Sequence, residues 1–164
     1  AASDVYKRQL IKGITTGKIV DYGVKDSMNM GACMAPAAAE LIEANFKDLD
    51  VDKDYYDAIF TGDLGEIGNR ILSELLKEKG IDIVDKLFDC GMLIYEGETK
   101  CSGGSGCGCS AVVLGTYIMD KLIRGEYKRV LFVPTGALLS TVSYNEGKSV
   151  PGIAHGVILE GKES

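Results

Sequence analysis

The pattern of apolar and polar positions along the chain predicts strands that alternate with helices. Short apolar runs at residues 57–62 and 86–90 are typical of strands, and the first of them stops at Gly62. Apolar residues recur every three or four positions after residues 34–36, where we expect a first helix to begin because Pro36 suits a first turn. A second helix is expected around residues 71–76, with Gly80 as its stop.

The same pattern predicts three further strands. They are expected at residues 18–22, at 128–133 as a continuous apolar strand of the buried kind, and at 152–160 as the last one. Strands that alternate with helices in this way are typical of an α/β layered domain with a mixed or parallel sheet.

A loop rich in glycine and serine, residues 101–109, is followed by a helix predicted from Ser110 to about Ile123. This helix is apolar nearly all the way round, which is typical of a helix that is buried on both sides. A lone domain of 164 residues would have difficulty burying it. We therefore expect either another half of the same chain or a partner to cover it, and we expect the chain alone to be prone to aggregation.

Composition and charge narrow the class of protein. Hydrophobic residues make up 46% of the chain, and 21 glycines fit many tight turns better than disorder. The net charge of −6 argues against a nucleic-acid partner, because phosphates need a basic surface. The longest apolar stretch, residues 130–139, is interrupted by Pro134 and is too short to cross a bilayer. Any association with a membrane is therefore expected to depend on partners.

The five cysteines, an odd number, favour reduced thiols in a cytosolic compartment over a disulfide framework. Cys101, Cys107 and Cys109 are spaced C-x5-C-x-C, whereas zinc sites usually pair C-x2-4-C with a second pair or with histidines. The single histidine, His155, is far along the chain. We predict no metal site and no cofactor.

Residues 1–9 resemble the translation of a transposon-end adapter used in sequencing libraries. We therefore expect residues 1–9 to be a non-native, adapter-derived segment and leave them out of the prediction of the fold; the other interpretation is a short disordered leader. Residues 10–164 are then expected to form one carboxy-terminal α/β domain whose amino-terminal half is missing.

Six segments in one uninterrupted order resemble the stage V sporulation protein AD family. They are Asn-Met-Gly-Ala at 29–32, Met-Ala-Pro-Ala-Ala at 34–38, Thr-Gly-Asp-Leu-Gly at 61–65, Asp-Cys-Gly-Met-Leu-Ile-Tyr at 89–95, Gly-Gly-Ser-Gly-Cys at 103–107, and Ile-Ala-His at 153–155. Each segment alone is a weak signal, but the ordered set is specific. The resemblance runs from about Lys12 to Glu160 and covers about the carboxy-terminal half of the family's length.

The resemblance implies a thiolase-like fold, in which two similar α/β halves stack with central helices between their sheets. This chain would supply one half, with a mixed or parallel five-stranded sheet and helices on both faces. It also implies binding of dipicolinic acid and help with its uptake into the developing endospore, together with membrane proteins of the same sporulation complex. The resemblance also implies that the protein lies in the cytoplasm or forespore, where those partners hold it at the inner spore membrane. Proteins of this fold are usually homodimers.

Condensing enzymes of this fold are implied to use a cysteine of the amino-terminal half with a histidine and an asparagine, or a second histidine, of the carboxy-terminal half. Here Gly62 and Asp63 stand where the histidine is usual, and Gly104 and Ser105 stand near the asparagine position. An aspartate would oppose a developing oxyanion, so we expect condensing chemistry to be lost and predict no catalytic residue. Two alternatives stay open: a thiolase-like enzyme acting on an acyl thioester, and a structural docking subunit of a membrane transport complex.

The loop before residue 110 is the best ligand candidate, because glycines let a ligand approach the backbone and a helix start favours anions such as dipicolinate. The glycines are equally well explained by close packing of a buried helix, and Cys107 and Cys109 by small buried side chains. The predicted ligand-binding residues are Asp63, Gly103, Gly104, Ser105, Gly106, Cys107 and His155.

Two of these residues have a structural alternative. Asp63 is expected to orient a ligand or to cap the helix after Gly68; facing an anion, it would need a cation between them, such as calcium that accompanies dipicolinate. His155 has apolar neighbours, which favours a structural histidine over a ligand contact.

Overall fold

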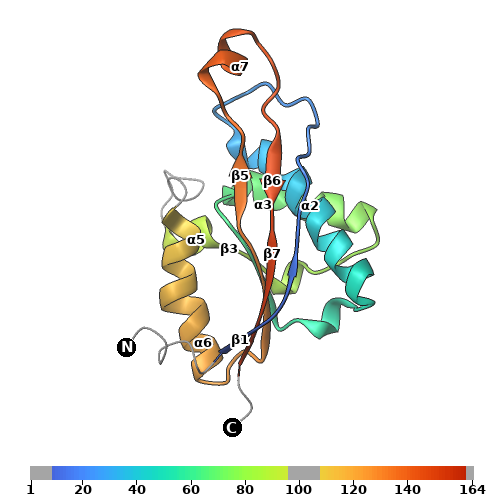
Figure 1. The fold of residues 1–164 in the computed structure, drawn as a ribbon, viewed down its shortest axis with the longest axis vertical. Coiled ribbons are helices and arrows are strands. Elements are labelled where there is room, and N and C mark those ends of the chain that lie inside the picture. Colours follow the sequence, from blue (N-terminus) through green and yellow to red (C-terminus); the bar gives the residue numbers. More distant parts are fainter. Residues whose placement is uncertain (1–8, 96–107, 162–164) are drawn as a thin grey trace.

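A computed structural model describes residues 9–95 and 108–161 of the chain. Its main sheet has the strand order β1-β7-β4-β2-β3, and a separate two-stranded sheet pairs β5 with β6 (Figure 1). Strands β3, β2 and β4 are parallel, whereas β7 runs antiparallel to both β4 and β1. The strands are Gln9–Thr15 (β1), Ala58–Thr61 (β2), Leu87–Asp89 (β3), Arg129–Val133 (β4), Thr135–Ala137 (β5), Gly152–Ala154 (β6) and Gly156–Gly161 (β7).

Helices cover both faces of the main sheet, as predicted. Side chains alternate along β4: Leu131 and Val133 pack in the core formed with α2 and α3, and Val130 and Phe132 pack in the core on the side of α5 and α6. The helices are Met30–Leu49 (α2), Gly65–Glu78 (α3), Cys90–Ile94 (α4), Gly108–Val113 (α5), the π-helical turn Leu114–Ile118 (η3), Met119–Ile123 (α6) and Thr141–Asn145 (α7), with 3-10 turns at Lys53–Tyr55 (η1) and Val84–Lys86 (η2).

Several predicted elements are confirmed. The strands expected at residues 57–62, 86–90 and 128–133 are β2, β3 and β4. In α3, Leu72 and Leu76 are buried in the core. Gly80 follows this helix with a φ of +78°, a left-handed conformation that glycine adopts readily and that ends helices.

The first helix begins earlier than the proline indicated. It starts at Met30, where the side chain of Asn29 accepts a hydrogen bond from the Ala32 amide at 3.2 Å. Pro36 lies inside the helix and is buried. The prediction of a start at residues 34–36 was wrong because the asparagine cap, not the proline, sets the helix boundary.

The beginning of α2 packs closely on the turn between β2 and α3. A Cβ atom at Gly31 would lie 2.2 Å from the carbonyl oxygen of Leu64, so only glycine permits this approach. The contact fixes where the turn after β2 sits relative to α2.

Two of the predicted strands need correction. Residues 18–22 form no strand; Val20 makes only an isolated bridge to Gly152, with backbone hydrogen bonds of 2.9 and 2.8 Å. The strand expected at residues 152–160 is divided at His155 into β6 and β7, which belong to different sheets.

Other elements were missed altogether. The sequence did not predict β1, because its first residue, Gln9, belongs to the segment left out of the prediction and the others show no clear alternation of apolar and polar residues. Only Thr15 of this strand is buried. The segments β5, α7 and β6 form an arm that projects from the main sheet at the top of Figure 1.

The helical segment formed by α5, η3 and α6 is covered on one side only in the described part of the chain. Val113, Ile118 and Leu122 are buried against the sheet, whereas Val112 is 53% exposed on the outer side. Within the described residues the outer side of this helical segment is therefore uncovered. No charged residue occurs between Gly108 and Met119, so the expectation that another part of the protein covers this face stays a prediction.

A buried polar network joins β1, α2 and the segment before β2. The Tyr56 hydroxyl donates to Asn45 Oδ1 at 2.6 Å, and Asn45 Nδ2 donates to Thr15 Oγ1 at 2.8 Å. Tyr56 and Asn45 are fully buried, and burial raises the pKa of Tyr56 to about 12. All three side chains are thus held in the core by mutual hydrogen bonds.

Tyr56→Phe is expected to lower the free energy of unfolding by about 1.5 kcal/mol, because it leaves the buried Asn45 Oδ1 without its donor. Thermal unfolding of the two proteins measures the effect. Tyr144→Phe is the matched control: Tyr144 is 62% exposed in α7, so its change is expected to stay within about 0.5 kcal/mol. Equal melting of wild type and Tyr56→Phe would show that this network does not stabilise the fold.

Candidate functional site

Polar residues gather where the carboxyl ends of β2 and β4 meet at one edge of the sheet. Gly62 and Asp63 follow β2, Thr135 follows β4 after a single proline, and Ser110 lies in the first turns of α5. β2 and β4 are parallel neighbours, so their carboxyl ends share this edge. In open α/β sheets, ligands bind outside the carboxyl ends of the strands, which makes this edge the candidate site.

The backbone at Gly62 is in close contact with two hydroxyl-bearing residues. A Cβ atom at this position would lie 2.6 Å from Thr135 Oγ1, 2.9 Å from Thr135 N and 3.3 Å from Ser110 Oγ. Any side chain at position 62 would require Thr135 to move. The backbone after β2 is thus packed directly against Thr135.

Asp63 is half-buried beside α5, and the Cys109 thiol donates to Asp63 Oδ2 at 3.7 Å. The helix that was expected after Gly68 begins earlier in the chain. The helix begins at Gly65, and the amide of Gly65 donates to Asp89 Oδ1 at 3.2 Å. A role of Asp63 toward a ligand stays a prediction.

Asp89 is the buried carboxylate that organises this end of the sheet, and the sequence prediction missed it. Only 2% exposed, it accepts hydrogen bonds from Thr61 Oγ1 and Leu64 N at 2.8 Å, Met92 N at 3.1 Å and Gly65 N at 3.2 Å. Burial raises the pKa of Asp89, while the hydrogen bonds act in the opposite direction. An aspartate between a predicted strand and a following turn is an N-cap signal that could have identified it.

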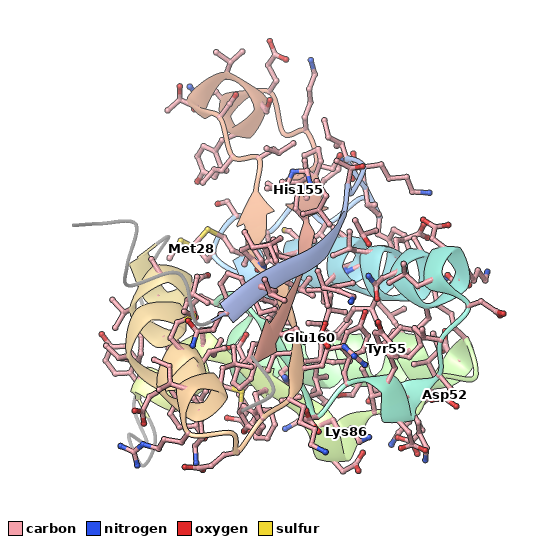
Figure 2. All side chains as sticks on the ribbon, turned by 60° about the horizontal axis from the view of Figure 1, so that its bottom comes forward. Met28, Asp52, Tyr55, Lys86, His155 and Glu160 are labelled. Carbon is pink, nitrogen blue, oxygen red and sulfur yellow. The ribbon has the colours of Figure 1, made fainter. Side chains whose placement is uncertain are left out.

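His155 lies at the same edge of the sheet, on the other side of β4 from Gly62 and Asp63, and its amide donates to the carbonyl oxygen of Pro134 at 3.3 Å. It stands between β6 and β7, and its exposed imidazole accepts a hydrogen bond from the Gly17 amide through Nδ1 at 3.2 Å. Figure 2 shows it near the base of the arm, far from Glu160 at the opposite end of the sheet. This contact agrees with the structural alternative for His155; a ligand contact stays a prediction.

The remaining predicted ligand residues, Gly103, Gly104, Ser105, Gly106 and Cys107, lie outside the described residues. The described cysteines are Cys33, Cys90 and Cys109, and all three are buried. Burial raises the pKa of Cys90 to about 12 and that of Cys33 above its usual value. Because the thiolate is the reactive form, these two thiols are poorly suited to nucleophilic chemistry.

Within residues 9–95 and 108–161, no group of three or more histidine, cysteine, aspartate or glutamate side chains is arranged to hold a metal ion. Among the helices of these same residues, none has the length and apolar character needed to cross a membrane.

Comparison with known sequences decides the family. Residues 2–160 match the family model of Stage V sporulation protein AD (SpoVAD). The chain belongs to this family. It is 46% identical over 151 residues to the Stage V sporulation protein AD of Bacillus subtilis (strain 168), and this match covers 92% of the chain and 45% of the relative. The chain thus spans about half the length of the curated relative it matches, and the resemblance found in the sequence is confirmed.

Solved structures confirm the thiolase-like fold. The tetronic acid condensing enzyme AbyA1 superposes with a TM-score of 0.52 and 16% identity, over 93% of this chain and 47% of that one. The 3-oxoacyl-(acyl carrier protein) synthase III of Pseudomonas aeruginosa PAO1 superposes with a TM-score of 0.53 and 11% identity, over 96% of this chain and 51% of that one. At such identities the likeness concerns the fold alone.

Proposed function

We propose that this chain is part of a non-catalytic protein that binds dipicolinic acid and assists its uptake into the developing endospore. Membership of the sporulation family supports a role in sporulation. The proposal that the protein is not catalytic is supported by the packing at Gly62. A Cβ atom on this residue would lie only 2.9 Å from Thr135 N. A histidine base does not fit there without displacement of the backbone after β4.

The candidate site suits a ligand that brings both carboxylates and a cation. The Ser110 hydroxyl offers a hydrogen-bond donor at the edge of the sheet, and Asp63, which accepts from the thiol of the preceding Cys109, places a carboxylate near it. A free dicarboxylate would be repelled by Asp63, whereas a calcium ion bound between them would remove the repulsion. We infer that dipicolinate binds here with calcium, and that the loop at residues 103–107 adds further contacts.

The uncharged outer face of α5 and η3 supports a second part of the proposal. Residues 108–119 carry no charge, and Val112 is more than half exposed. An exposed helix in water normally carries polar residues on its outer side. We infer that an amino-terminal half of the same protein covers this face, and that membrane proteins of the same sporulation complex hold the assembled protein, itself a homodimer, at the inner spore membrane.

The decisive experiment is calorimetric titration of dipicolinate, with and without calcium, into this chain joined to the amino-terminal half of the Bacillus subtilis relative. We expect saturable binding that Gly104→Val weakens and that Asp63→Ala weakens only when calcium is present. Asp85→Ala, at an exposed position of η2, is the matched control and is expected to bind as wild type does. A well-folded protein that shows no binding would refute the proposed function.

A thiolase-like enzyme acting on an acyl thioester is the second candidate, because the superposed structures include condensing enzymes. An acyl group transferred to a cysteine of the joined protein would favour this candidate, and its absence would count against it.

A docking subunit without a small ligand is the third candidate. It predicts binding to membrane partners that substitutions in the loop at residues 103–107 leave unchanged.

A further inference from the structure

The short turn that carries Asp63 is attached at both of its ends to one buried carboxylate. At the end of β2, Thr61 Oγ1 donates to Asp89 Oδ2 at 2.8 Å. The amide of Leu64, the residue directly after Asp63, donates to the same oxygen, also at 2.8 Å. The two residues in between, Gly62 and Asp63, are therefore enclosed by residues that share a single acceptor atom.

Further contacts hold the backbone of this turn and leave the side chain of Asp63 directed elsewhere. The amide of Gly91 in α4 donates to the carbonyl oxygen of Gly62 at 3.2 Å, and the start of α2 also packs on the turn. The side chain of Asp63 extends toward α5, where the thiol of Cys109 donates to Asp63 Oδ2 at 3.7 Å. The position of the Asp63 carboxylate is thus set by the position of the backbone that carries it.

Capping of its own helix does not account for the bonds that Asp89 makes. A capping side chain accepts from amides of the helix that it precedes, and Asp89 does so for α4 through Met92 N at 3.1 Å. Its bonds from Thr61, Leu64 and Gly65 join it instead to a segment more than 20 residues earlier in the chain. Asp89 is only 2% exposed, so this carboxylate does not itself contact a ligand.

We propose that Asp89 is a positioning residue of the candidate site, because it fixes the turn at Gly62 and Asp63 and thereby sets where the Asp63 carboxylate meets a bound cation or ligand. A side chain that binds a cation must be held in place by the residues around it, and replacing those residues weakens binding. Here the support reaches Asp63 through the backbone on either side of it. The inference rests on the proposed function, since it needs a small ligand at Asp63.

Thr61→Val tests the inference in the chain joined to the amino-terminal half. Valine keeps the shape of threonine but removes one of the two donors to Asp89 Oδ2, which loosens one end of the turn. We expect the affinity for dipicolinate in the presence of calcium to fall about fivefold. Thr61→Ser retains the hydroxyl and is expected to keep most of the affinity. Asp89→Asn, the more disruptive change, is expected to weaken binding further wherever the protein remains folded.

Ile59→Val is the control that matches the loss of stability. Ile59 is fully buried in the same strand, and removing one of its methyl groups is expected to lower the melting temperature about as much as removing the Thr61 hydrogen bond. Its aliphatic side chain donates nothing to Asp89, so we expect Ile59→Val to bind dipicolinate as wild type does. Equal losses of affinity in Ile59→Val and Thr61→Val would assign the effect to stability alone and overturn the inference.

A double-mutant cycle with Asp63→Ala shows whether the effect passes through Asp63. In the Asp63→Ala protein, Thr61→Val is expected to cause no further loss of affinity in the presence of calcium, because the side chain that it positions is absent. The same fivefold loss in both backgrounds would show that Thr61 and Asp89 act on binding independently of Asp63, and the inference would fail.

Calorimetry with dipicolinate and with acetyl-coenzyme A separates the inference from the proposed function. If wild type and Thr61→Val bind dipicolinate equally well, the inference fails and the proposed function stands. If only acetyl-coenzyme A binds, the proposed function fails, and the inference stands only where Thr61→Val weakens that binding through Asp63. Binding of neither molecule to wild type overturns both.

Discussion

Asp89→Asn is expected to lower the free energy of unfolding by about 3 kcal/mol, although the two side chains have nearly the same size. The carboxylate of Asp89 accepts hydrogen bonds from the amides of Leu64, Gly65 and Met92. An asparagine has one acceptor oxygen and directs its NH2 group at a backbone N–H group. The starts of α3 and α4 therefore lose part of their shared cap in one substitution.

Thermal or chemical unfolding measures how much Asp89→Asn lowers the free energy of unfolding, and Asp85→Asn is the matched control. Both substitutions remove one negative charge, but Asp85 is exposed in η2 and contributes no buried contact. The control is expected to change the free energy of unfolding by less than about 0.5 kcal/mol. Similar small effects at both positions would show that the buried carboxylate does not hold the two helix starts.

The hydrophobic pattern predicted the elements whose burial is uniform. β4 is buried at four of its five positions and β2 at all four, so their apolar runs are unbroken and bounded by polar residues. β1 has a single buried residue and its register shifts between Ile11 and Gly13, so no period of two is visible. Strands at the edge of a sheet with solvent on one side carry weaker patterns than central strands.

Only the part of the candidate site that depends on a local sequence signal could be predicted. The turn after β2 could be located from Gly62 and Asp63, because a glycine follows an apolar strand. The pairing of Asp89 with that turn depends on β3 lying beside β2, which is a tertiary contact. The approach of Ser110 to Gly62 depends equally on the position of α5. Neither contact leaves a local pattern in the sequence.

The second large effect is expected at Gly62, where histidine would lower the free energy of unfolding by about 3 kcal/mol. The φ angle of Gly62 is not positive, so the cost comes from the collision with Thr135. The hydroxyl of Thr135 can rotate away from a new side chain, but its amide nitrogen, 2.9 Å from the place of the Cβ atom, is backbone and moves only with β5. Introducing the histidine that condensing enzymes of this fold are implied to use therefore strains the sheet edge instead of creating a base.

Two alanine variants separate this collision from the general cost of replacing glycine. At Gly136, a Cβ atom would meet only Ile153 Cγ2 at 3.5 Å, an ordinary contact. We expect Gly136→Ala to melt close to wild type, Gly62→Ala to melt lower, and Gly62→His to melt lowest and to gain no condensing activity with acetyl-coenzyme A. A stable Gly62→His protein with such activity would mean that the edge of the sheet still accepts a catalytic base, and the non-catalytic proposal would have to be abandoned.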